Sequence, residues 1–199
     1  VCREGLVGMH WVSASPQVTV PGGMRPVLGT NPIAFGVPTG VDPIVFDMAT
    51  SAIAGSDVMH RERIGEPLPE GVGVDREGNP TRDATEARRG GILTFDGHKG
   101  FGLSLAVQAL GLLAGAALQQ GKVKDYGFLL LVLDPKLTLP GGEFPDQMSD
   151  LVTKIKSTPK RPGVDEIRVP SERSFRERER RRREGLVFDR KVVESLEAL

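Results

Sequence analysis

The sequence predicts an α/β protein with a largely mixed sheet and flanking helices, and three observations support this. Two apolar runs, PIVFDMATS (43–51) and GFLLLVLD (127–134), have the length and apolarity of buried strands. A third run, GLVGMHWV (5–12), also indicates a strand. Between the strands, apolar residues follow helical spacing from Lys99 to about Leu118. The run 127–134 is too apolar for an edge strand, so we expect it inside the sheet.

The segments between these elements are predicted from their turn formers. LGTNPIAFGVPTG (28–40) indicates a loop that contains a short strand. The strand in 43–51 ends at Asp47, and the small residues after it predict a helix that starts near Thr50 or Ser51. Residues 64–83 are rich in turn formers, yet valines alternate with glycines there, so we expect an ordered excursion.

The C-terminal third is predicted to be a linker with three helices. An amphipathic pattern predicts a helix from Phe144 to Ile155 within the linker 135–168. A charged helix is predicted from Ser171 to about Glu184, and a short final helix around 191–199.

The charged helix carries an arginine-rich run, RVPSERSFRERERRRREG (168–185). By itself this run could bind RNA. However, the pairs Glu172–Arg176, Glu177–Arg181 and Glu179–Arg183 are each spaced i,i+4, which favours a solvated helix that pairs its own charges.

Composition restricts the class of protein and its partners. The chain has 199 residues, with 26 Lys+Arg and 26 Asp+Glu, and therefore no net charge that would favour nucleic acid or a membrane as partner. Hydrophobic residues at 39% and charged residues at 26% are typical of a soluble globular protein. The single cysteine, Cys2, excludes an internal disulfide and favours the reducing cytoplasm.

The loop GHKGFG (97–102) is the first candidate site. Its glycines allow a ligand to approach the backbone, and the positive end of a helix follows it. Lys99 adds a full positive charge there, which indicates phosphate or carboxylate binding. The alternative is a tight turn whose lysine extends to solvent. The loop matches neither the dinucleotide fingerprint nor the P-loop.

Asp47 and the histidines are further candidates. Asp47 lies at the carboxyl end of a buried strand, where it could accept hydrogen bonds from a ribose, orient a base, or cap the next helix. His98 could be a general acid or a structural residue. His10 and His60 have no metal-ligand spacing, so we expect no metal site.

Four strings carry a family resemblance: LGTNPIAFGVP (28–38), IVFDMATS (44–51), RIGEPLPEG (63–71) and GHKGFGLSLAVQAL (97–110). Their order along the chain and their residue patterns resemble those of the malate/L-lactate dehydrogenase family of the second type. This non-Rossmann group includes ureidoglycolate dehydrogenases, diketogulonate reductases and cyclic imino-acid reductases. The resemblance implies a homodimer that transfers a hydride between NAD or NADP and a 2-hydroxy or 2-oxo acid, such as malate or lactate.

The resemblance also implies which residues hold the cofactor. His98 stands where the family usually has an aromatic residue, so it is expected in the cofactor wall rather than as the catalytic acid. Ser171 replaces a family glycine, and Ser13 replaces an asparagine. The expected cofactor-binding residues are Ser13, Asp47, Met48, Ala49, His98, Lys99, Ser171 and Glu172.

The same resemblance suggests how the chain is organised. Residues 1–134 are expected to form a cofactor-binding α/β domain, which residues 135–199 complete with a linker and C-terminal helices. The family's catalytic histidine lies before the equivalent of Gly5, so no catalytic residue is assigned among the three histidines of this chain. We therefore expect an N-terminally truncated form of the fold with weak cofactor binding and no efficient turnover. The alternative is a non-catalytic cofactor-binding or dimerisation module left by truncation.

Overall fold

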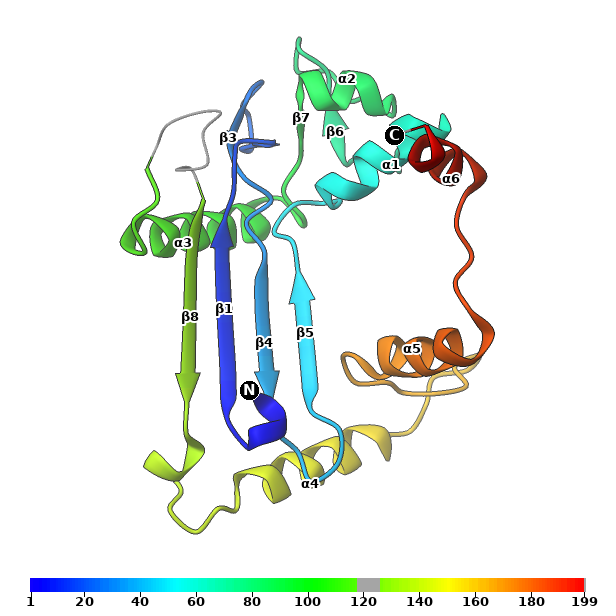
Figure 1. Ribbon diagram of the computed structural model, residues 1–199. Coiled ribbons are helices and arrows are strands. Elements are labelled where there is room, and N and C mark those ends of the chain that lie inside the picture. Colours follow the sequence, from blue (N-terminus) through cyan, green and yellow to red (C-terminus); the bar gives the residue numbers. More distant parts are fainter. Residues whose placement is uncertain (118–125, 199) are drawn as a thin grey trace. The chain divides into compact units, whose positions relative to one another are not determined.

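The computed structural model describes residues 1–117 and 126–198 and divides into two compact units (Figure 1). Unit 1 comprises Val1–Met9, Ala34–Phe46 and Leu131–Leu199, and unit 2 comprises His10–Ile33 and Asp47–Leu130. Both units are assembled from segments that are far apart in the sequence. The division between residues 134 and 135 stays a prediction.

The first sheet has four strands in the order β5-β4-β1-β8. Neighbouring strands of this sheet point in opposite directions in Figure 1. The strands expected from the three apolar runs and from the loop 28–40 all form here. They are β1 (Val7–Ser13), β4 (Ile33–Val37), β5 (Ile44–Met48) and β8 (Gly127–Leu133).

Strand β8 does not lie inside the sheet, so this prediction is wrong. Among the described strands β8 pairs only with β1, at the end of the sheet order. Its residues Phe128 and Leu130 are 64% and 51% exposed, and 131–133 are exposed as well. The apolar residues of a strand show that it could be buried. Whether it is buried depends on which other segments of the chain pack against it.

The second sheet belongs to unit 2 and is mixed, as the sequence predicts. Strand β2 (Val18–Thr19) is antiparallel to β3 (Pro26–Leu28) and parallel to β7 (Gly91–Ile92), and β6 (Gly73–Val74) is antiparallel to β7. Two helices, α1 (Gly55–Ile64) and α2 (Ala84–Arg89), contribute to the same core. The buried core residues are Val18, Leu28, Val58, Leu68, Val72, Ala84, Ala87 and Ile92.

The excursion 64–83 is ordered, as expected. Leu68 is fully buried, and Val72 and Val74 are buried on either side of Gly73. The turn after Val74 closes on Asp75, whose carboxylate accepts hydrogen bonds from the backbone N–H of residue 79 at 2.8 Å. This turn chemistry is what the string DREGNP predicts.

The helix expected near Thr50 or Ser51 begins later, at Gly55, so this prediction is wrong. The backbone N–H and the hydroxyl of Thr50 both donate to the carbonyl of Thr30, at 2.8 and 3.0 Å. Ser51 forms an antiparallel bridge with Thr94. These tertiary hydrogen bonds hold the segment extended, and a local preference of small residues for helix starts cannot outweigh them.

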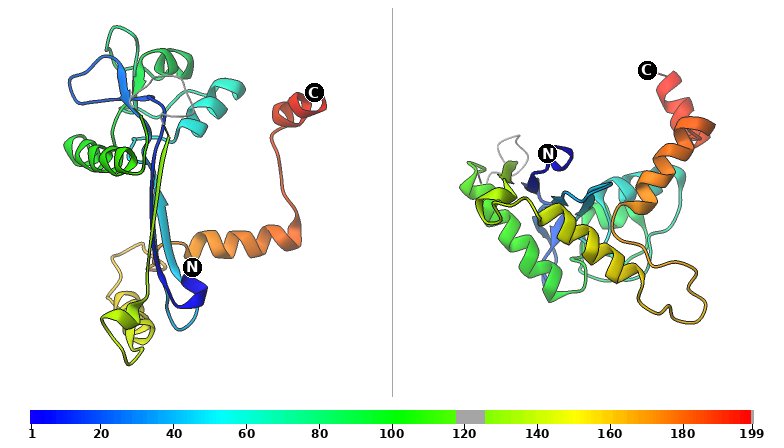
Figure 2. Two further views of the ribbon diagram at one scale, coloured as in Figure 1. Left: turned by 60° about the vertical axis from the view of Figure 1, so that its left-hand side comes forward. Right: turned by 90° about the horizontal axis from the view of Figure 1, so that it is seen from below.

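The remaining helices form in the regions where the sequence predicts them. They are α3 (His98–Leu113), α4 (Phe144–Lys156), α5 (Glu172–Glu184) and α6 (Arg190–Glu197), and Figure 2 shows them from two further directions. The described residues also form two short 3-10 helices, η1 (Cys2–Glu4) and η3 (Pro135–Leu137). Helix α3 is shorter than expected, because it ends at Leu113 with Ala114 as its C-cap, whereas the sequence predicted an end near residue 118. Residues 118 and 199 themselves lie outside the described residues. Within the described parts of the chain, none of the helices has the length and apolarity needed to cross a membrane.

Helix α5 is lined by ion pairs, as its sequence predicts, although the partners differ in detail. Arg181 pairs with Glu177 at 2.6 Å, which confirms one expected pair. Glu172 pairs with Lys156 of α4 rather than with a residue of its own helix. Arg180 also binds Glu177, and the guanidinium groups of Arg180 and then Arg181 lower the pKa of Glu177 to about 2.

Candidate functional site

Two of the segments predicted to hold the cofactor lie side by side in unit 2. The end of β5 continues into an extended stretch, 47–52, which pairs with residues 93–95 before α3. The N–H of Phe95 donates to the carbonyl of Thr50 at 3.2 Å, and the N–H of Ala52 donates to the carbonyl of Leu93 at 2.7 Å. The segments that carry Asp47 and Lys99 are therefore joined by backbone hydrogen bonds.

Asp47 is exposed, while Met48 and Ala49 are half-buried and Thr50 is fully buried. The residues on both sides of Asp47 along the extended segment are half-buried, so its carboxylate is the exposed group of this segment. Asp47 does not cap α1, because that helix starts eight residues later. Of the roles considered for Asp47, contact with a ligand is compatible with this geometry, and the helix cap is excluded.

The loop before α3 is a tight turn closed by its own side chains. Asp96 and Gly97 have φ values of 43° and 56°. The hydroxyl of Thr94 donates to the carbonyl of Gly97 at 2.8 Å. These contacts present the first residues of α3, including exposed His98, at the protein surface.

Lys99 forms an ion pair with Asp96, with 2.7 Å between Nζ and the carboxylate oxygen. Both side chains remain more than half exposed. Asp96 is thus the carboxylate that balances Lys99 at the positive end of α3. The exposed lysine agrees with the interpretation as a tight turn, and the binding of phosphate or carboxylate stays a prediction. The lysine lies in solvent, and an incoming anion would have to compete with a single exposed carboxylate.

The glycines of α3 have different roles. A Cβ at Gly100 would overlap the carbonyl oxygen of Phe95, and a Cβ at Gly111 would overlap the hydroxyl of Ser13. At those two positions glycine allows another part of the protein, rather than a ligand, to approach the backbone of α3. A Cβ at Gly102 would meet nothing within 4 Å, so this exposed glycine leaves open space one turn beyond the loop.

Ser13 is fully buried between α3 and the start of β8. Its hydroxyl accepts a hydrogen bond from the N–H of Gly127 at 2.9 Å. This position ties two strands together and leaves the side chain no exposed atom for a ligand. The contact between Ser13 and a cofactor stays a prediction that this geometry does not favour.

Asn31 was not predicted as a site residue, yet its side chain connects several elements. It is fully buried, and its amide nitrogen donates to the backbone carbonyl and hydroxyl of Ser104 and to the side chain of Gln108, at 3.1 to 3.2 Å. Its oxygen accepts from the N–H of Ala14 at 3.2 Å. The string TNP could have suggested a left-handed residue, and the φ of Asn31 is 38°.

Ser171 and Glu172 belong to unit 1, where α5 begins. Ser171 has φ of 74°, in the left-handed region that favours glycine, which explains why glycine suits this position. Its hydroxyl does not cap α5 but donates to the carbonyl of Val45. Glu172 accepts from the N–H of Val169 at 3.3 Å and pairs with Lys156.

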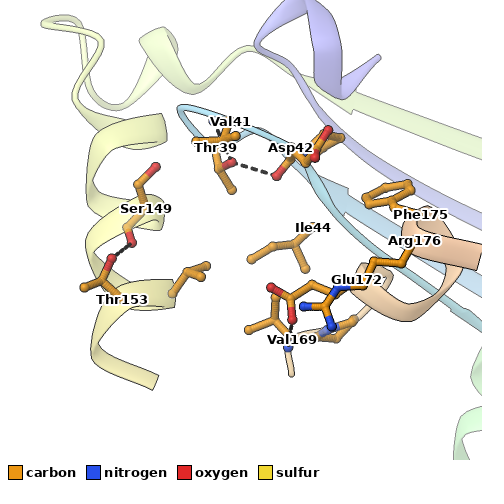
Figure 3. Close-up of a pocket in the computed structure, with 13 residues that line it drawn as sticks. Thr39, Val41, Asp42, Ile44, Ser149, Thr153, Val169, Glu172, Phe175 and Arg176 are labelled. Atoms are coloured by element: carbon orange, nitrogen blue, oxygen red, sulfur yellow. Dashed lines mark hydrogen bonds between the residues drawn. The ribbon is translucent and has the colours of Figure 1, made fainter. Parts of the chain in front are cut away.

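A cavity of about 340 Å³ lies beside Glu172 within unit 1 (Figure 3). Three segments form its walls: the turn between β4 and β5, one face of α4, and the start of α5. The lining residues are Thr39, Val41, Asp42, Pro43, Ile44, Ser149, Val152, Thr153, Val169, Pro170, Glu172, Phe175 and Arg176. Apart from Glu172, sequence reasoning assigned none of these residues to a site, because the three segments are far apart along the chain.

Comparison with known proteins shows the family of the chain. The family model described as malate/L-lactate dehydrogenase matches residues 1–197. The chain is 34% identical over 209 residues to the malate/(S)-sulfolactate dehydrogenase of Methanothermus fervidus, covering 99% of this chain and 59% of that protein. It is 39% identical over 210 residues to a Delta(1)-pyrroline-2-carboxylate/Delta(1)-piperideine-2-carboxylate reductase of Pseudomonas aeruginosa, covering 99% and 61%.

The fold is likewise similar to solved structures. A dehydrogenase from Sinorhizobium meliloti superimposes with a TM-score of 0.89 at 28% identity, covering 99% of this chain and 60% of that chain. The chain thus spans about 60% of the length of the relatives that it matches.

Proposed function

Because this chain belongs to the malate/L-lactate dehydrogenase family, we propose that it acts in an NAD(P)-dependent oxidoreductase. The reaction is hydride transfer between the nicotinamide cofactor and a 2-hydroxy or 2-oxo acid, or a related cyclic imine. The printed names of the relatives support this range of substrates, since they include a malate/sulfolactate dehydrogenase and an imine-carboxylate reductase. A homodimer is part of the same proposal.

One observation carries the proposal: the segment of Asp47 and the loop of Lys99 are hydrogen-bonded neighbours in unit 2. Together they offer an exposed carboxylate, an exposed ammonium group at a helix N-terminus, and the open space at Gly102. These groups fit a nucleotide, whose phosphates attract Lys99 and whose hydroxyls can donate to Asp47.

When bound, the nicotinamide group supplies or accepts the hydride. The residues of this chain would hold it: Lys99 would pair with the cofactor's anionic groups, and Asp47 would accept hydrogen bonds from its hydroxyls. A place for His98 beside the cofactor stays a prediction, since its side chain is exposed at the protein surface. No proton donor or acceptor for the substrate is assigned within this chain.

The direct test is a fluorescence titration of the purified chain with NADH and NADPH. We expect Lys99→Ala to weaken nucleotide binding about tenfold, or about 1.4 kcal/mol, because it removes a cation that pairs with an anionic ligand. Asp96→Asn should have the opposite effect, since it releases Lys99 from its ion pair. Lys154→Ala, which removes an exposed lysine on α4, is the matched control.

Unchanged affinity in Lys99→Ala would disprove this assignment. Nucleotide binding without any turnover of 2-oxo acids would favour the alternative, a non-catalytic cofactor-binding module.

A further inference from the structure

The outer face of helix α3 is exposed and entirely apolar. It is formed by Gly102, Leu105, Ala106, Ala109, Leu112 and Leu113. Of its leucines, Leu113 is 78% exposed and Leu105 is 53% exposed. The buried residues of α3 lie on the opposite side of the helix. In both views of Figure 2, α3 lies at the outside of unit 2. An exposed apolar surface of this kind marks an interaction site.

Helix α3 has no charge after its first turn. The sequence from residue 100 to residue 117 contains no charged residue, and its polar side chains are those of Ser104 and Gln108. Both accept hydrogen bonds from the buried amide nitrogen of Asn31, so they are directed into unit 2. A helix at the surface of a globular unit normally has a polar outer face, whereas a helix that is apolar on every side is normally buried. The outer face of α3 therefore has the composition of an interface.

This composition favours a second copy of the chain as the partner. A helix that binds a membrane surface carries lysines and arginines beside its apolar face, and a charged protein partner would require opposite charges. Residues 100–117 provide neither. A surface that is apolar throughout can pair with itself, because a two-fold axis brings the same residues of two copies together.

The spacing of residues on the outer face fits an antiparallel pair of helices. Four residues follow the spacing i, i+4, i+7 and i+11, and so lie on one line along α3: Gly102, Ala106, Ala109 and Leu113. Gly102 comes four residues before the first alanine, and Leu113 comes four residues after the second. A two-fold axis between the alanines therefore brings Gly102 opposite Leu113 of the partner subunit. A Cβ at Gly102 would meet nothing within 4 Å, so there is room for that leucine.

The ends of the helix favour the same orientation. Antiparallel pairing places the positive N-terminal end of each α3, which carries Lys99, beside the negative C-terminal end of the other. At the centre, Ala106 and Ala109 have small side chains, so the two helix axes can approach to about 8 Å, the short end of the usual range. Charge and shape thus agree on one arrangement.

We propose that the outer face of α3 pairs with the same face of a second copy, in a two-fold symmetric dimer whose two α3 helices are antiparallel. The inference rests on the homodimer of the proposed function, and it adds the surface that forms this dimer. One helix face is small against the roughly 800 Å² per partner of a standard interface, so the dissociation constant of the dimer is on the order of micromolar.

The test is analytical ultracentrifugation of the whole chain over a range of concentrations. We expect a monomer of 21.4 kDa in reversible equilibrium with a dimer of twice that mass. A chain that stays monomeric at every concentration would overturn the inference together with the homodimer, and would leave a different protein as the partner of the outer face. Titration of the same samples with NADH tests the oxidoreductase assignment separately, so the two failures can be told apart.

A charged substitution tests the surface. Ala109→Arg places two like charges beside the two-fold axis and should raise the dissociation constant of the dimer at least about tenfold. Met59→Arg makes the same kind of change at a residue of α1 that is 51% exposed, and this matched control should leave the dimer unchanged. A dimer that persists unchanged in Ala109→Arg would place the interface elsewhere and overturn the inference, while the homodimer would stand.

A pair of substitutions tests the antiparallel arrangement. Gly102→Leu fills the space that Leu113 of the partner subunit occupies, and it replaces a glycine that weakens the helix. The folded monomer should therefore keep its stability, as circular dichroism during thermal unfolding can check, while the dimer weakens about tenfold through overpacking. Adding Leu113→Ala removes the overlap and should restore the dimer. If the two substitutions weaken the dimer additively, the antiparallel arrangement is wrong.

Discussion

At the scale of the residue, Asn31 shows how one buried amide can position helix α3, which carries part of the candidate site. Three of its hydrogen bonds connect the loop before β4 to α3, the helix that begins with His98 and Lys99, and a fourth connects this loop to Ala14. We expect Asn31→Ala to lower the free energy of unfolding by about 2–3 kcal/mol, because buried polar partners lose their hydrogen bonds. Chemical denaturation of the full chain measures this change.

Asn31→Gly separates the two possible causes of that loss. Glycine accepts the φ of 38° at this position, so the variant keeps the backbone conformation and removes only the side chain. A comparable loss with glycine would assign the effect to the hydrogen bonds. Near-native stability of Asn31→Gly would contradict this account and point to the backbone conformation instead.

At the scale of the element, helix α5 has no buried residue and carries several exposed side-chain ion pairs. The folded pKa of Glu177 is about 2, below the usual 4.5, so its contribution to stability is present above about pH 4.5 and is lost as the pH falls toward 2. We expect α5 to fray over this window, with a smaller effect at high salt. Backbone amide chemical shifts of α5 in the full chain follow the change.

Glu177→Gln is the control for this titration. The variant has no carboxylate to protonate at that position, so the acid-dependent fraying of α5 should become weaker. A titration identical to that of the unmodified chain would show that Glu177 does not stabilise the helix.

At the scale of the whole molecule, the buried apolar residues that form the core cluster all belong to unit 2. Helices α4, α5 and α6 of unit 1 have no buried residues. We expect amide hydrogen exchange to be slowest in β2, β7, α1 and α2 and faster in these three helices, because protection follows buried apolar contact. Exchange monitored by mass spectrometry resolves the segments, and equal protection in both sets would contradict this account.

The sequence predicted much of the fold because many of its signals are local. Helical spacing located α3, α4 and α5, and the string DREGNP located the turn at Asp75. The predictions that failed depend on distant partners. The segment at Thr50 pairs with residues 93–95, and β8 lies at the end of its sheet. Neither fact can be predicted from the residues next to Thr50 or β8 in the sequence.

By itself the sequence determined the class of fold, the family resemblance, and the candidate residues Asp47 and Lys99, because motifs and periodicity are properties of contiguous residues. Only the tertiary structure decided which of those residues meet. It joined the segment of Asp47 to the loop of Lys99, buried Ser13 between α3 and β8, and assembled the cavity beside Glu172 from three distant segments. The physical reason is that hydrogen bonding and burial depend on contacts between segments, and these contacts exist only after the chain has folded.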